Sequence, residues 1–275
     1  MKNNSRARFR SNRGFTRADL VAALTGASLV AGLALTTAGT HRQAAQTEGC
    51  RANLRRLSQA FNVFALDHRD VFPGNRFSAG SGNPTNWCDR VFLDFTATPR
   101  NWDPSGLTNG TLWPYATDAD SWHCPGDPSI VSVPNVGERR RIRSYSMNSY
   151  IGSSTSPFST DYRTFSKVSE MNLIGAERAF LILDEHPGSI NDGTLYVDMS
   201  GFPSQPTKRQ WLDFPGSHHL GAANLSFADG HVETWSWRDP RTKPPFKSGT
   251  PLNVNGSSPN NPDIHRLQSV TTIPL

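Results

Sequence analysis

The sequence is short of cysteine, of charge and of long apolar runs. Of its 275 residues, 19% are charged and three are cysteines, which excludes a small disulfide-stapled fold. Only residues 20–39 form an uncharged, mainly apolar stretch of membrane-spanning length, so a polytopic membrane protein is excluded as well. Aromatic residues reach 10% and include seven tryptophans. A chain with such large groups to bury is expected to form one globular core with appendages.

The signatures of common enzymes and metal sites are also missing. The chain has no Gly-x-Ser-x-Gly elbow, no Walker loop and no Rossmann fingerprint. Ser217 precedes two histidines, but adjacent residues point apart and do not form a catalytic pair. We therefore expect no enzymatic activity. The absence of Cys-x2-Cys and His-Glu-x2-His spacings argues against zinc.

Unbalanced positive charge is confined to the N-terminus. Residues 1–14 contain five basic and no acidic residues, and the net charge of the whole chain is +5, so the remainder is neutral. A neutral body has no bulk attraction for polyanions, and we expect no nucleic-acid partner. Next to the apolar stretch 20–39, the basic leader predicts a single transmembrane segment in the inner membrane. The N-terminus would be cytoplasmic and the chain after Gly39 would lie in the periplasm.

A second interpretation of the apolar stretch is an export signal. Cleavage near Ala38 would then release an exported soluble enzyme or binding protein. The two interpretations predict different mature N-termini.

Helical periodicity continues beyond the apolar stretch. Leu54, Leu57, Phe61 and Phe64 recur at intervals of three or four residues and form one apolar stripe. We predict one helix over residues 15–66, whose second half packs its stripe on a globular head.

Strand patterns follow in the second half of the chain. Residues 143–152 and the apolar run 179–185 predict strands, the second of them central and buried on both faces. In 222–237, Asp229-Gly230 lies between two strand-like runs and predicts a hairpin with a type I′ turn. Residues 239–262 are rich in Pro, Asn and Gly and predict a surface tail.

The junction between leader and apolar stretch resembles a known processing site. Gly14-Phe15-Thr16-Arg17-Ala18-Asp19 is similar to the cleavage and methylation site of type IV prepilins and type II secretion pseudopilins. The resemblance implies cleavage after Gly14 by a prepilin peptidase and N-methylation of Phe15. Asp19 stands at the fifth mature position, where that family has Glu. The resemblance gives it an assembly role, in which it pairs with the terminal ammonium of a neighbouring subunit.

The hairpin region carries a second resemblance. His219 precedes Asp229-Gly230 by nine residues, which resembles the His-x9-Asp-Gly processing-associated domain of planctomycete and verrucomicrobial pseudopilin-like proteins. Outside the cytoplasm, two of the three cysteines can oxidise, and three pairings are possible. Because Cys50 and Cys124 fall in family-like motifs and Cys88 does not, the resemblance implies a Cys50–Cys124 disulfide.

Acidic and histidine side chains near the strand ends are candidates for a metal site. Asp184, His219, Asp229 and His231 are able to hold a divalent cation if the fold brings them together. Major pseudopilins use calcium, so the resemblance implies Ca²⁺ as the candidate ion. Spacing alone does not show that the four converge, and we expect these side chains to serve turns and hydrogen bonds, with no cofactor.

Together these patterns predict an α+β, pilin-like fold. A leader (1–14) precedes a long N-terminal helix (15–66) with a transmembrane segment (20–39), packed on a globular head (67–238) with an antiparallel sheet, and a tail (239–275). The implied function is a structural subunit of a type II secretion pseudopilus or type IV pilus-like filament. Its implied partners are the prepilin peptidase and N-methyltransferase, other pilin or pseudopilin subunits and the inner membrane.

Overall fold

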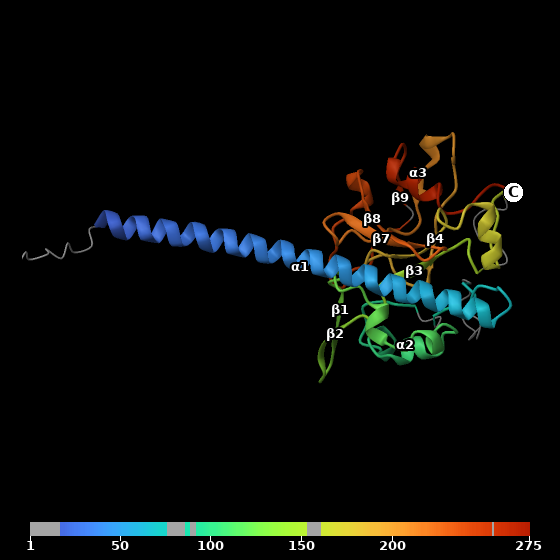
Figure 1. The fold of residues 1–275 in the computed structure, drawn as a ribbon, viewed down its shortest axis with the longest axis horizontal. Helices are drawn as coiled ribbons and strands as arrows, with labels where there is room; N and C mark the ends of the chain where they lie inside the picture. Colours follow the sequence, from blue (N-terminus) through green and yellow to red (C-terminus); the bar gives the residue numbers. More distant parts are fainter. Residues whose placement is uncertain (1–16, 76–85, 89–91, 153–160, 255) are drawn as a thin grey trace, which may run out of the picture. The chain divides into compact units, whose positions relative to one another are not determined.

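A computed structural model describes residues 17–75, 86–88, 92–152, 161–254 and 256–275, without the side chains of 18, 19, 22, 23 and 25–38. The helices are α1 (Arg17–Asp67), α2 (Ser105–Thr108) and α3 (Pro262–Gln268). The strands are β1 (Ile130–Val133), β2 (Gly137–Arg140), β3 (Tyr145–Asn148), β4 (Phe180–Asp184), β5 (Thr194–Leu195), β6 (Gln210–Trp211), β7 (Ala222–Phe227), β8 (Val232–Ser236) and β9 (Gly256–Ser257) (Figure 1).

The residues of helix α1 are divided between two compact units. Residues 1–44 form one unit and residues 45–275, which include the end of the helix, form the other. In the first unit, the side chains of Leu20, Val21 and Leu24 are each about three-fifths exposed. In the second, which we call the head, Leu54, Leu57, Phe61 and Phe64 are at most 6% exposed and fill the core. The predicted apolar stripe is confirmed.

Two residues in the left-handed region end helix α1. Arg69 has φ 57° and Asp70 has φ 70°, and the amide of Asp70 donates to the carbonyl of Ala65. A non-glycine residue with positive φ breaks the helical repeat, so the chain turns back over the head after Asp67.

A five-stranded sheet forms the centre of the head, in the order β5-β3-β4-β7-β8. Strand β4 is central and fully buried, as its apolar sequence predicts. Its neighbours β3 and β7 run antiparallel to it, and β7 pairs antiparallel with β8. Strand β5, however, is parallel to β3. The sheet is therefore mixed.

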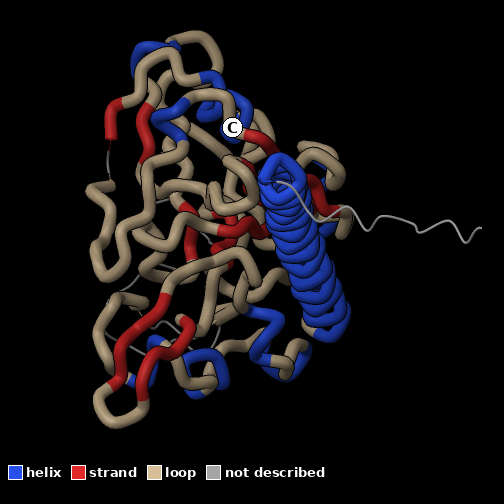
Figure 2. Tube along the Cα trace, turned by 90° about the vertical axis from the view of Figure 1, so that its left-hand side faces the viewer, coloured by secondary structure: helices blue, strands red, loops and turns tan. Residues whose placement is uncertain are grey.

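Apolar clusters cover both faces of this sheet. The cluster on one face joins Met147 and Ile182 to the stripe of α1. The cluster on the other face joins Leu225 and Trp235 to helix α3. Strand β4 contributes to both clusters, with Leu181 and Ile182 in the first and Phe180 and Leu183 in the second. The register shift between Phe180 and Ile182 coincides with the two consecutive residues that share a cluster. Figure 2 shows strands near the middle of the head and others at its periphery.

The predicted fold class is wrong on two points. The head is mostly β, with a mixed sheet and only short helices besides α1 in its described part, instead of an α+β head with an antiparallel sheet. Over the described residues, no helix combines the length and apolar character required to cross a membrane. The predicted transmembrane segment 20–39, and with it the pilin-like class, is corrected accordingly. Most of its residues are Ala, Gly, Ser or Thr, whose small side chains bury little apolar surface.

The hairpin of β7 and β8 is confirmed, but its turn is not type I′. The amide of Gly230 donates to the carbonyl of Phe227, and the amide of Phe227 donates to the carbonyl of His231. Ala228 therefore belongs to the loop, which has three residues instead of two. Of the predicted Asp-Gly pair, Gly230 has a positive φ of 91° and Asp229 does not. This pattern is a type I turn followed by a glycine bulge.

Residues 239–275 pack on the head where the structure describes them. Strand β9 pairs with β6, and the side chains of Ile264 and Leu267 in helix α3 are buried. The side chain of Asn261 caps α3 by accepting from the amides of Asp263 and Ile264. The predicted surface tail thus contains a helix that contributes to the core.

Several carboxyl groups are buried beside the sheet. Desolvation raises the pKa of Asp213 from 3.8 to about 8 and that of Asp192 to about 6. The pKa of Glu185 is raised by burial and by the charge of Asp213. The Oδ2 atom of Asp213 accepts from the amide of Tyr196 at 2.8 Å. These carboxyl groups are protonated in the folded chain at pH values where they are ionised in the unfolded chain.

We predict that the free energy of unfolding falls as pH rises from 5 to 8. Over this range the folded chain binds more protons than the unfolded chain, which costs about 1.4 kcal/mol per pH unit for each proton retained. Asp213→Asn keeps an acceptor for Tyr196 and should flatten the dependence. Urea unfolding of the wild-type chain and of Asp213→Asn at several pH values measures how the free energy of unfolding depends on pH. Equal slopes of free energy against pH in the two proteins would contradict the prediction.

Candidate metal centre

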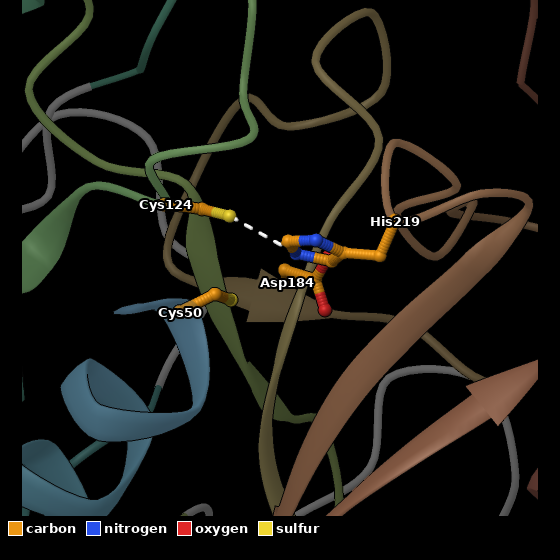
Figure 3. Close-up of side chains that lie close together, drawn as sticks. All are labelled: Cys50, Cys124, Asp184 and His219. Atoms are coloured by element: carbon orange, nitrogen blue, oxygen red, sulfur yellow. Dashed lines mark hydrogen bonds and ion pairs between the residues drawn. The ribbon is translucent and has the colours of Figure 1, made fainter. Parts of the chain in front are cut away.

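Four side chains from distant parts of the sequence converge in the head. Cys50, Cys124, Asp184 and His219 each offer one ligand atom, and these atoms all lie within 4.8 Å of one another. All four residues are buried, with at most 5% exposure. Figure 3 shows the two sulfur atoms, the carboxylate and the imidazole ring facing a common point. We call these four residues the Cys-Cys-Asp-His cluster.

Helix α1 supplies Cys50. Its position on the buried stripe of the helix turns the thiol toward the sheet, where the hydroxyl of Tyr145 donates to Sγ at 3.5 Å. Tyr145 is itself fully buried on strand β3. The hydrogen bond restricts the direction of the Cys50 sulfur.

The Cys-Pro-Gly-Asp turn supplies Cys124. The amide of Cys124 donates to Ser144 Oγ at 3.0 Å, and Sγ accepts from the amide of Gly126 at 3.3 Å. A Cβ atom at Gly126 would lie 2.9 Å from Cε1 of His219. The turn therefore needs glycine at 126 so that the imidazole can approach the Cys124 sulfur.

Asp184 ends strand β4 and is fully buried. Its Oδ1 accepts a hydrogen bond from the amide of Asn224 on the neighbouring strand β7. Its Oδ2 lies 3.0 Å from Nε2 of His218, with which it forms an ion pair, and 3.5 Å from Nε2 of His219. The ion pair with His218 offsets part of the cost of burying this carboxylate.

His219 lies in the loop before β7, and both of its ring nitrogens have neighbours. Nδ1 lies 3.1 Å from the hydroxyl oxygen of Thr47 on helix α1. Nε2 lies 3.2 Å from Sγ of Cys124. With Nδ1 bonded to Thr47, Nε2 is the nitrogen directed at the cluster.

The two thiols of the cluster differ in acidity. Burial alone would raise the pKa of Cys50, but hydrogen bonds with Cys124 and His219 lower it from 9.0 to about 6. Burial and the neighbouring Cys50 raise the pKa of Cys124 well above its ordinary value. Beside the cluster, burial opposes protonation of His218, but Asp184 raises its pKa to about 9. The site thus carries at least one negative charge in a dry environment.

The structure brings together some of the predicted site residues. Cys50 and Cys124, the predicted disulfide pair, are neighbours in the cluster but are free thiols. Asp184 and His219 join them. Asp229 and His231 do not, because His231 Nδ1 pairs with Asp229 Oδ1 at 2.6 Å on the partly exposed hairpin.

The predicted processing residues lie at the edge of the described chain. Gly14 and Phe15 are outside the described residues, and Asp19 is part of helix α1 with its side chain outside the described set. The structural role of Gly230 is the bulge of the hairpin turn.

The sequence patterns missed the combination of cysteines with Asp184 and His219. Each of the four belongs to a different segment, and no short spacing links any two of them. The available signal was that each lies in a motif or at a strand end: Cys50 on the helical stripe, Cys124 in the Cys-Pro turn, Asp184 after the apolar run and His219 in the His-x9-Asp-Gly motif.

The donor atoms are two sulfurs, one imidazole nitrogen and one carboxylate oxygen. Four protein ligands complete a tetrahedral coordination shell, which is typical of structural sites, whereas catalytic sites keep a position for water or substrate. The arrangement is suited to hold a metal ion.

Comparison with known proteins adds no relative. No family model matches the chain, and neither does any curated protein or solved structure.

We predict that Gly216→Ala destabilises the head. A Cβ atom at 216 would lie 2.5 Å from Oδ2 and 3.0 Å from the carbonyl oxygen of Asp184, so the carboxylate must move. The expected loss is about 1–3 kcal/mol of unfolding free energy, the range for overpacking. The control is Gly39→Ala, since a Cβ atom there meets nothing within 4 Å. Urea unfolding under reducing conditions should separate the two variants, and equal stabilities would count against this packing.

Proposed function

We propose that the protein is a structural subunit of a filament of the type II secretion pseudopilus or type IV pilus kind, processed between Gly14 and Phe15. The proposal is supported by the resemblance of residues 14–19 to a prepilin processing site and by one observation on helix α1. The helix buries its C-terminal stripe in the head but exposes Leu20, Val21 and Leu24 near its other end.

The exposed residues form one face of the helix. Leu24 follows Leu20 by four positions and Val21 by three, and side chains at these intervals are neighbours on a helix surface. Burying each of them fully would contribute roughly 1.5–3 kcal/mol. Packing against the same segment of other copies would bury this face, which is what a filament subunit requires.

The head supports a structural role instead of a catalytic one. Among the described residues, the cysteine, histidine and acidic side chains that converge as potential ligands are those of the Cys-Cys-Asp-His cluster, and each is at most 5% exposed. We therefore assign assembly as the function of the chain.

Processing is tested by mass spectrometry of the mature protein. We expect it to begin with N-methylphenylalanine at Phe15, and Gly14→Glu should leave the full-length chain. The peptidase subsite is expected to admit glycine only, because glycine has no side chain and an unrestricted backbone. A mature chain that begins near residue 38 would contradict the proposal and favour the cleaved-signal interpretation.

Assembly is tested by cross-linking in cells. Leu24→Cys places a reactive thiol at a 60% exposed position, and a bismaleimide should join it to Leu24→Cys of a neighbouring copy as a covalent dimer. Leu173→Cys, at a 57% exposed position on the head, is the matched control and should remain monomeric. All three native cysteines are buried and should not react, so each chain carries one reactive thiol. Adding Gly14→Glu should abolish the dimer, and a dimer of equal yield in the control would contradict a helix-mediated contact.

A further inference from the structure

We propose that Cys50, Cys124, Asp184 and His219 bind one Zn²⁺ ion as a closed structural site. The site joins helix α1 to strand β4 and to the loops that carry Cys124 and His219. This inference is independent of the proposed filament.

The spacing of the ligand atoms fits a tetrahedral zinc ion. With bonds of roughly 2.0–2.3 Å, two ligand atoms of such a site lie about 3.3–3.8 Å apart. The distance from Cys124 Sγ to His219 Nε2 is 3.2 Å, and that from His219 Nε2 to Asp184 Oδ2 is 3.5 Å. All four ligand atoms lie within 4.8 Å of one another, so a contraction of about 1 Å at most brings the widest pair to tetrahedral spacing.

Each ligand also has a contact outside the cluster. Thr47 contacts Nδ1 of His219, and the hydroxyl of Tyr145 donates to the sulfur of Cys50. Backbone amides serve the other two ligands: that of Gly126 donates to the sulfur of Cys124, and that of Asn224 donates to Oδ1 of Asp184. Such outer contacts orient ligands in metal sites and leave one lone pair of each directed at the ion.

The second carboxylate oxygen of Asp184 is buried at the end of the central strand and faces the cluster. Oδ2 lies 3.0 Å from Nε2 of His218, its ion-pair partner, and 3.5 Å from Nε2 of His219, the ring nitrogen that also contacts Cys124. Two cysteine sulfurs and this carboxylate are thus gathered out of water, where a cation between them stabilises their ionised forms. A zinc ion would accept an electron pair from Oδ2 and from each deprotonated sulfur.

The donor set selects zinc over calcium. Ca²⁺ takes six to eight oxygen ligands, and the cluster offers one carboxylate and two sulfurs. Thiolate and imidazole ligands in a four-coordinate site are typical of Zn²⁺. The calcium that the sequence resemblance implies does not suit this chemistry.

A disulfide between Cys50 and Cys124 is the competing state. Forming the S–S bond would remove two electrons and the thiol protons and so would consume both sulfur ligands. The disulfide and the zinc site are therefore mutually exclusive, and the content of zinc and free thiols in the isolated protein distinguishes them.

The test uses the full chain, purified without added metal and then treated with chelator and reductant. Added Zn²⁺ should bind at one equivalent per chain and raise the melting temperature, because an ion that binds only the folded state stabilises it by mass action. Co²⁺ should bind in its place and give the visible bands of tetrahedral cobalt together with a thiolate-to-cobalt charge-transfer band. Absence of these bands in the wild-type chain would overturn the proposal whatever the variants do.

Variants identify the ligands. Cys124→Ser and Asp184→Asn should lose the cobalt charge-transfer intensity or the bound zinc, whereas Cys88→Ser alters the third buried cysteine and should keep both. Thr47→Val removes the contact to His219 and should weaken zinc binding about 10–100-fold, with Thr47→Ser as the conservative control. Loss of metal in Cys88→Ser alone would overturn the assignment. So would recovery of the native protein without zinc and with Cys50 bonded to Cys124.

Discussion

Burial of one stripe of helix α1 against the sheet is the interaction on which the rest of the head depends. Leu54, Leu57 and Phe61 are fully buried there and share an apolar cluster with β3 and β4. Each buried side chain of this size contributes roughly 1.5–3 kcal/mol, far more than an exposed ion pair of the helix. Cys50 lies on the same stripe, so the packing that stabilises the helix also positions the Cys50 thiol in the Cys-Cys-Asp-His cluster.

Local sequence patterns predict the helices and strands of the head, but they do not predict how distant strands pair. The stripe of α1, the buried strand β4 and the β7–β8 hairpin follow from residue periodicity and turn chemistry within a few residues. The parallel pairing of the two-residue strand β5 with β3 depends on contacts between distant segments, which no periodicity encodes. The type I′ turn fails for a related reason: the strands stop at Phe227 and Val232, so the loop includes Ala228 and only Gly230 needs a positive φ.

The sequence predicts the candidate site in halves. A family resemblance pairs Cys50 with Cys124, and the affinity of carboxylates and imidazoles for cations makes Asp184, His219, Asp229 and His231 candidate ligands. Neither argument joins the cysteines to Asp184 and His219, because these four side chains meet only where α1, β4 and two loops are packed together. Asp229 and His231 stay outside the cluster, since they pair with each other on the hairpin.

The position of Cys50 explains why a cross-link would be useful there. Among the described side chains of α1, Cys50 is the first that is fully buried, while those from Thr40 to Ala45 are exposed. Separation of such a helix from the core begins at its first buried residue, because the exposed residues before it make few packing contacts. A bond from Cys50 to β4 and the two loops would resist separation where it begins. A disulfide would join Cys50 to the Cys124 turn alone, whereas a zinc ion would also join it to Asp184 at the end of β4 and to His219.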